Sequence, residues 1–294
     1  MTTPLHPSAA TGFDQGAATY ARGRPDYPPA IVDWLREALG LAPQRRVVDL
    51  GAGTGKFMPS LLATGADIVA IEPVAGMRAQ FAADFPQLAI LDGTAEAMPL
   101  ADTSVDAVVC ATAFHWFATA AALAEIRRVL RPGGRLGLVW NVRDERVAWV
   151  ARLADLVRGY AGDTPRQADD AWRRVFPADG FGPLQHSEFA HAHEGPAETV
   201  IVGRLLSTSF IAAQPAPARE ELAQRIRALI AAEPETVIVG RLLSTSFIAA
   251  QPAPAREELA QRIRALIAAE PELAGRGRVA MPYRTMAYVT RKIA

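Results

Sequence analysis

Short apolar runs alternate with helical patterns along the first half of the chain. The segments Ala30 to Leu39 and Ala120 to Leu130 repeat apolar residues at helical spacing, so each predicts an amphipathic helix. Between the helical patterns, apolar runs predict five buried strands, at Arg46 to Leu50, Ile68 to Ile71, Leu88 to Leu91, Val105 to Cys110 and Arg135 to Trp140. Continuous apolar strands that are separated by helices are typical of a parallel sheet with helices on both faces. The pattern therefore predicts a doubly wound α/β fold that binds its ligand at the carboxyl ends of the strands.

The second half of the chain has a different pattern. Helical patterns near Val147 to Tyr160 and Asp169 to Val175 are followed by predicted strands at His186 to His191 and Val279 to Thr290. We expect a single domain over residues 1–294. It is expected to consist of an N-terminal cap segment (1–45), a cofactor-binding core (46–146) and a C-terminal half (147–294).

A segment of 37 residues occurs twice without a substitution, at 198–234 and 235–271. Helical solenoids have repeats of this length, but their repeats diverge and normally number at least three. Two identical copies instead indicate a recent tandem duplication or an artefact, and removing one copy from the 294 residues leaves 257, a usual size for one α/β domain. Proline interrupts each copy, so each predicts a helical hairpin that precedes the last strand.

Composition argues for a small-molecule partner. The chain has 31 basic and 31 acidic residues and a pI near 7.0, so neither nucleic acid nor an anionic membrane is an expected partner. No apolar run approaches 18 residues, and the N-terminus lacks a signal-peptide pattern. The single cysteine, Cys110, fits a reducing compartment. We therefore expect a soluble cytoplasmic protein.

The segment VVDLGAGTGKF, Val47 to Phe57, carries the main chemical signal. It places Gly51, Gly53 and Gly55 between a strand and a helix, where glycine allows positive φ angles and a close approach of the ligand. The spacing is G-x-G-x-G, unlike the G-x-G-x-x-G of dinucleotide sites. Asp49 precedes the turn and would repel a pyrophosphate, so it favours a ligand with a positive group, such as a sulfonium compound with an α-amino group.

A second carboxylate, Glu72, ends the next strand. A carboxylate at that position accepts hydrogen bonds from both hydroxyls of a ribose, and the same charge would repel the 2′-phosphate of NADP. The alternative is a solvated charge at a strand end.

Several segments occur in the order and spacing of a known family: VVDLGAGTGKF, IEPVAGM, LDGTAEAMPL, VDAVVCATAFHWF and EIRRVLRPGGRLGLVWN. The chain resembles the class I S-adenosylmethionine-dependent methyltransferases. The opening FDQGAATYARGRPDYP and the closing MPYRT also resemble the small-molecule group that includes trans-aconitate methyltransferase. The resemblance implies a Rossmann-like, seven-stranded, mostly parallel sheet with an antiparallel last strand, and S-adenosylmethionine as the cofactor.

The resemblance also implies the cofactor contacts. The glycine turn would line the methionine end, Glu72 the ribose, Met77 the adenine face, the segment Asp92 to Glu96 the adenine edge, and Ala111 to His115 the floor beneath the sulfonium. Met77 alone is more often ordinary core. The implied cofactor-binding residues are Asp49, Gly51, Ala52, Gly53, Thr54, Gly55, Glu72, Met77, Asp92, Thr94, Ala95, Glu96, Ala111 and Phe114.

Candidates on the acceptor side follow the fourth strand and lie in the N-terminal segment. His115 is the candidate catalytic residue, as a general base or as a group that orients a carboxylate; the alternative is a structural hydrogen bond to a loop carbonyl. Trp116, Tyr20 and Arg24 join His115 as candidate substrate contacts, although an exposed arginine is more often a solvated charge. No metal site is expected, because the pair His191 and His193 lacks further ligands nearby.

The predicted activity is transfer of a methyl group from S-adenosylmethionine to a small carboxylate, hydroxyl or amine. Two alternatives stay open. One is a module that binds S-adenosylmethionine without turnover, and the other, which the glycine spacing disfavours, is an NAD-dependent dehydrogenase.

Only one hairpin has a place before the last strand, so the apolar face of the other needs a partner or drives self-association. Deleting residues 235–271 tests this interpretation. We expect the shortened chain to keep cofactor binding, measured by calorimetry, and to be more soluble, because lengthening a surface connection twofold costs only about 0.6 kcal/mol. Loss of binding would show that the second copy is needed.

Overall fold

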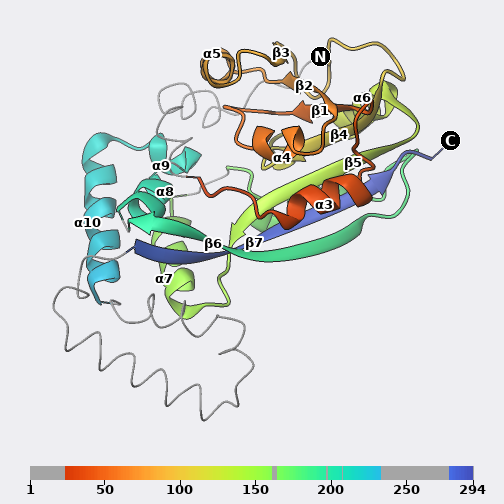
Figure 1. Ribbon diagram of the computed structural model, residues 1–294. Helices are drawn as coiled ribbons and strands as arrows, with labels where there is room; N and C mark the ends of the chain where they lie inside the picture. The colour runs from red at the N-terminus through yellow and green to blue at the C-terminus, as the bar shows by residue number, and fades with distance from the viewer. Residues whose placement is uncertain (1–23, 161–163, 197, 207, 233–277, 294) are drawn as a thin grey trace. The chain divides into compact units, whose positions relative to one another are not determined.

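The computed structural model describes residues 24–160, 164–196, 198–206, 208–232 and 278–293 (Figure 1). The chain divides into two compact units. The first unit consists of Met1–Val142, Gly162–His191 and Arg284–Ala294, and the second of Arg143–Ala161 and Ala192–Tyr283. The boundaries expected near residues 45 and 146 stay a prediction.

Seven strands form one sheet in the order β3-β2-β1-β4-β5-β7-β6. Four pairs of neighbouring strands are parallel: β1 with β2, β2 with β3, β1 with β4, and β4 with β5. The strands are β1 (Arg46–Leu50), β2 (Asp67–Ile71), β3 (Ala89–Leu91), β4 (Val105–Ala111), β5 (Leu130–Arg143), β6 (Gln185–Pro196) and β7 (Arg278–Arg291). The order reverses between β1 and β4, and in doubly wound sheets ligands bind at such a point.

The last strand runs against its neighbour β5. The backbone N–H of Lys292 donates to the carbonyl of Gly134 at 2.8 Å, and the N–H of Asp144 donates to the carbonyl of Pro282 at 3.0 Å. Residue numbers therefore fall along β7 as they rise along β5, which is the antiparallel arrangement. This confirms the expected fold, a mostly parallel, Rossmann-like sheet with an antiparallel last strand.

Helices cover both faces of the sheet in the first unit. Val47 faces one core together with Ile31 and Leu35 of α3, whereas Val48 faces another together with Ile126 of α6. This split follows from the alternation of side chains along a strand, and burying each of these aliphatic side chains contributes roughly 1.5–3 kcal/mol. The helical elements are α3 (Ala30–Glu37), α4 (Met58–Leu62), α5 (Ala75–Asp84), α6 (Ala120–Val129), η1 (Phe114–Trp116), η2 (Gln167–Asp169) and η3 (Ala171–Val175).

The second unit has its own core, made by α7 and the first copy of the duplicated segment. Trp149 and Leu153 of α7 are buried with Leu222 and Ile226 of α10. Pro215 lies between α9 and α10, but the predicted duplicated hairpin stays a prediction, because the second copy lies outside the described residues. The helical elements of this unit are α7 (Ala148–Arg158), η4 (Glu198–Gly203), α8 (Arg204–Leu206), α9 (Ser209–Ala212) and α10 (Ala216–Ala232).

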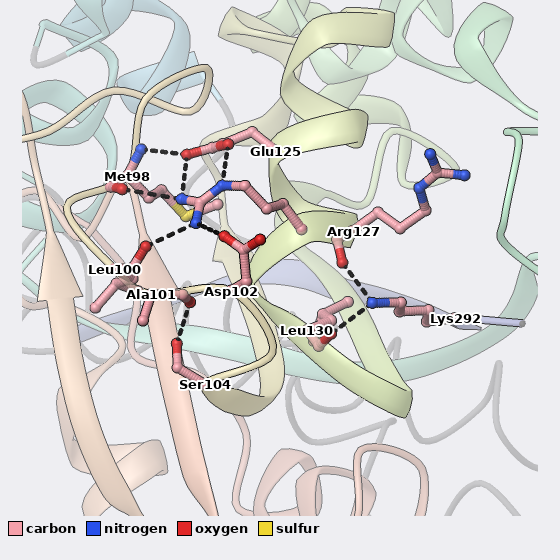
Figure 2. A network of polar contacts seen from close by, with 10 residues as sticks. Met98, Leu100, Ala101, Asp102, Ser104, Glu125, Arg127, Leu130 and Lys292 are labelled. Carbon is pink, nitrogen blue, oxygen red and sulfur yellow. Dashed lines mark hydrogen bonds and ion pairs between the residues drawn. The ribbon is translucent and has the colours of Figure 1, made fainter.

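A polar network on α6 fastens the loop between β3 and β4 (Figure 2). The carboxylate of Glu125 accepts the backbone N–H of Met98 at 2.7 Å and a hydrogen bond from the guanidinium of Arg128, also at 2.7 Å. Arg128 also donates to the carbonyl of Leu100 at 2.8 Å and to the carboxylate of Asp102 at 2.6 Å. One guanidinium thus connects α6 to the loop that follows β3.

Lys292 caps the other end of the same region. Its ammonium donates to the carbonyls of Arg127 at 2.8 Å and Leu130 at 2.7 Å, where α6 ends (Figure 2). A cation there matches the partial negative charge at the end of a helix.

Replacing Arg128 with methionine should lower the free energy of unfolding by about 2–3 kcal/mol, because hydrogen bonds to charged groups contribute more than neutral ones and Glu125 loses its partner. Urea denaturation measures the loss. Arg174 is exposed, so Arg174→Met is the matched control and should change the free energy of unfolding by less than about 0.5 kcal/mol. Equal losses in the two variants would contradict the assigned role of the network.

Candidate active site

The glycine turn lies at the carboxyl end of β1. Gly51, Gly53 and Gly55 have φ angles of 74°, 58° and 85°, a region that side chains other than glycine rarely adopt. The N–H groups of Gly51 and Ala52 both donate to the carbonyl of Ile71, at 2.9 and 3.1 Å. The turn is therefore tied to the end of β2 by backbone hydrogen bonds.

Glu72 holds the turn through its side chain. One carboxylate oxygen accepts the N–H of Gly53 and the other accepts the N–H of Val74, both at 2.9 Å. Only 5% of Glu72 is exposed, and burial raises the pKa of its carboxyl against the effect of these two hydrogen bonds. Each oxygen keeps a second lone pair, so the ribose role predicted for Glu72 fits the geometry and stays a prediction.

Asp49 is buried beside this carboxylate. It is 1% exposed, and its Oδ1 has no hydrogen-bond partner within the described ranges. Burial raises the pKa of Asp49 to about 8, and the nearby charge of Glu72 adds to the effect. Thr54, in the same turn, is also buried, and its hydroxyl has no partner in this part of the chain. Buried polar groups normally find partners, so both atoms fit a polar ligand bound at the turn.

The predicted adenine contacts lie next to the turn. Met77 of α5 is buried, and its sulfur would be 3.5 Å from a Cβ added to Gly53. The side chain of Asp92 is held by two hydrogen bonds from Arg78, at 3.0 and 3.1 Å, and Arg78 also donates to the carbonyl of Glu72 at 2.8 Å. Because Arg78 engages the side chain of Asp92, the predicted contacts with the adenine edge would be made by backbone N–H and carbonyl groups of the segment Asp92 to Glu96.

The remaining residues of that segment lie in the same loop after β3. Ala95 is buried, Glu96 is half-buried, and the hydroxyl of Thr94 is buried without a partner in the described part of the chain.

The segment after β4 packs directly on the glycine turn. A Cβ added to Gly51 would be 2.7 Å from the Cβ of Ala113 and 3.5 Å from the ring of Phe117, so only glycine fits there. Ala111 ends β4, next to this contact. The ring of Phe114 is fully buried among Phe117 and other aromatic rings of the core, and its predicted cofactor contact stays a prediction.

His115 lies in this segment and is bound to Trp140 of β5. The indole N–H of Trp140 donates to Nδ1 of His115 at 3.1 Å. Burial lowers the pKa of His115 to about 3, and the positive charge of Arg24 acts in the same direction. The imidazole is therefore neutral near pH 7. The predicted alternative is a hydrogen bond from the imidazole to a loop carbonyl, whereas the partner found among the described residues is an indole N–H on a neighbouring strand. Trp116 follows, and its ring centroid is 5.3 Å from that of His115.

The N-terminal segment reaches the same edge of the sheet. The hydroxyl of Tyr27 is 3.0 Å from that of Thr112, and the side-chain amide of Asn141 donates to the carbonyl of Asp26 at 3.2 Å. Arg24 is close enough to affect the pKa of His115, whereas Tyr20 lies outside the described residues. The sequence analysis missed Tyr27, Asn141 and Trp140, although they stand in the motifs DYP and VWN that carry the family resemblance.

Comparison with known proteins agrees with this geometry. A family described as "Methyltransferase domain" matches residues 48–138. An uncharacterized methyltransferase of Mycobacterium tuberculosis is 42% identical over 222 residues, which are 76% of this chain and 86% of that protein. The chain belongs to the class I S-adenosylmethionine-dependent methyltransferases. An uncharacterized methyltransferase of Schizosaccharomyces pombe is 36% identical over 210 residues, covering 71% of this chain and 82% of that protein.

A solved structure from Anaeromyxobacter dehalogenans that carries a methyltransferase assignment has the same fold. It matches this methyltransferase with a TM-score of 0.51 and 22% identity, over 91% of this chain and 96% of that one. The similarity to the trans-aconitate group stays a prediction.

In the ranges that the structure describes, no group of three His, Cys, Asp or Glu side chains is arranged to hold a metal ion. No helix in those ranges has the length and apolar character needed to span a membrane.

The raised pKa of Asp49 predicts how stability depends on pH. The carboxyl binds its proton more tightly in the folded chain than in the unfolded one, so folding stability should fall as pH rises from 3.8 towards about 8. At about 1.4 kcal/mol for each pH unit, the upper bound is about 6 kcal/mol. Asp49→Asn should flatten this part of the profile, measured by urea denaturation of the ligand-free protein. The exposed Asp179 provides the control, because Asp179→Asn should leave the slope unchanged.

Proposed function

We propose that this methyltransferase binds S-adenosylmethionine at the glycine turn and transfers the methyl group to a small-molecule acceptor. The observation that carries the proposal is the unpartnered Oδ1 of Asp49, an acid buried beside a second buried acid, Glu72. A cation bound there would stabilise the ionised form of Asp49, whereas a pyrophosphate would meet two acids. The α-ammonium group of S-adenosylmethionine supplies that cation.

The residues of the turn fit the rest of the cofactor as well. Glu72 is fixed by two backbone N–H groups and has lone pairs left for the ribose hydroxyls. Met77 offers a buried thioether against Gly53, where a flat ring would pack. These features disfavour NAD as the ligand, because its pyrophosphate would lie against Asp49.

When bound, S-adenosylmethionine supplies a methyl group whose carbon–sulfur bond breaks as the acceptor bonds to the carbon, and the electron pair returns to sulfur. The protein need not form a covalent intermediate, and its main task is positioning and exclusion of water. The close contact of Ala113 and Phe117 with Gly51 holds the β4 segment on the turn. Tyr27 and Asn141 hold residues of the N-terminal segment over the same strand ends.

Calorimetry with three ligands tests cofactor choice. S-adenosylmethionine and S-adenosylhomocysteine both carry the α-ammonium group, so both should bind and should release up to one proton at pH 7 as Asp49 ionises. Comparing buffers of different ionisation enthalpy measures the released proton. NAD should give no heat. Absence of heat with both sulfur compounds would refute the proposal.

Two variants refine this experiment. Asp49→Asn should abolish the proton release. Thr54→Val keeps the shape of the side chain and removes a hydroxyl that has no partner in the described chain, so it should leave stability unchanged and weaken binding by about 5- to 10-fold if the hydroxyl contacts the cofactor. A methyl-release assay across small carboxylates, phenols and amines then separates an enzyme from a binding module.

A further inference from the structure

The geometry around His115 determines which of its two ring nitrogens carries the proton. An indole N–H is a donor and never an acceptor, so Nδ1 of His115 must present its lone pair to Trp140. A neutral imidazole with a bare Nδ1 carries its proton on Nε2. Within the described part of the chain, Nε2 makes no hydrogen bond, so its N–H remains available for a ligand.

The indole of Trp140 is itself held in place. Trp140 is 1% exposed, and its ring centroid lies 4.6 Å from that of Trp172 and 5.9 Å from that of Tyr288. Such packing prevents the indole from turning its N–H away from His115. If His115 moved its proton to Nδ1, or became an imidazolium, two N–H groups would face each other and a buried donor would lose its acceptor.

His115 also lies where an acceptor must meet the methyl group. It belongs to the segment after β4 whose neighbours Ala113 and Phe117 contact Gly51 of the glycine turn. The charged groups that act on it are Arg24 and, with the opposite sign, Asp169. The effect of Arg24 is the larger, which places a positively charged guanidinium near His115.

We propose that Trp140 fixes His115 as a hydrogen-bond donor, and that its Nε2–H binds the carboxylate of an acidic acceptor. The inference rests on the proposed function. A carboxylate oxygen is already anionic, so it forms the bond to the methyl carbon while the carbon–sulfur bond breaks, and the products are a methyl ester and a neutral thioether. No proton is transferred, so no base is required. His115 is then a binding residue and Trp140 a positioning residue, and the general-base role considered for His115 is set aside.

Nitrogen NMR of the full chain, free of ligands and labelled at histidine, tests the tautomer without any assay of activity. The signal of His115, assigned from its loss in His115→Gln, should show an unprotonated Nδ1 and a protonated Nε2 throughout pH 5.5–8.5. Trp140→Phe should remove this preference. Trp149→Phe, which removes a buried indole from the core of the second unit, should leave it intact. A proton on Nδ1 of the wild type, or titration near pH 6.5, would overturn the inference.

Kinetics then test the acceptor class. With small carboxylates as probes, His115→Gln keeps a donor amide near the position of Nε2 and should retain kcat/KM within about fivefold, whereas His115→Leu should lose about 10- to 100-fold, the loss expected for a hydrogen bond to a charged group. If His115 were a base, Gln would be as poor as Leu, and turnover would favour phenols or amines. Loss of S-adenosylmethionine binding would refute the proposed function, whereas a wrong tautomer or the base pattern would refute only this inference.

Discussion

The clamp of Glu72 on the glycine turn is the interaction on which the site depends. Its two oxygens accept the N–H groups of Gly53, which follows β1, and Val74, which follows β2. Because both hydrogen bonds are to backbone, they set the path of the turn rather than a side-chain rotamer. Their cost is a buried carboxylate, and a second acid, Asp49, is buried next to it. The ligand-free site is therefore electrostatically unfavourable, and a cation is the group that relieves it.

A second constraint comes from the aromatic cluster beneath β4 and β5. Trp140 and Trp172 stack with tilted rings, and Tyr288 of β7 packs edge-on against both. The cluster belongs to the core, where such aromatic pairs contribute to packing. The indole N–H of Trp140 in this cluster donates to His115. Core packing is thus linked to the segment that follows β4.

Most of the fold could be predicted from the sequence, because local patterns encode it. The run Arg46 to Leu50 is apolar and bounded by a glycine turn, and it forms β1 with the same limits. The site could be predicted only where one segment carries it, as the glycine turn does. The pair Trp140 and His115, and the pair Thr285 and Asn141, join residues that are distant in sequence, and one sequence contains no sign of such contacts.

Phe114 shows how little a resemblance says about side-chain direction. The family resemblance implies that the segment Ala111 to His115 lies beneath the cofactor, and within that segment the ring of Phe114 is buried in the core. In a short 3-10 helix, successive side chains point in different directions, so neighbours of a site residue need not share its role. The same geometry separates buried Phe114 from His115, whose Nδ1 accepts the indole N–H of Trp140.

Asp49, on the proposed cofactor side of the site, and His115, on the proposed acceptor side, have pKa values shifted in opposite directions. Asp49 has a pKa near the working range of an enzyme, so it would change its charge in the proposed complex with a cation. The pKa of His115 is far below that range, and its Nδ1 accepts a hydrogen bond from Trp140. A pH dependence should therefore enter through the binding of the cofactor and not through the acceptor. That division fits displacement at a methyl group, because the reaction needs a charged donor and a nucleophile with a free lone pair, and an acidic acceptor arrives with that lone pair already available.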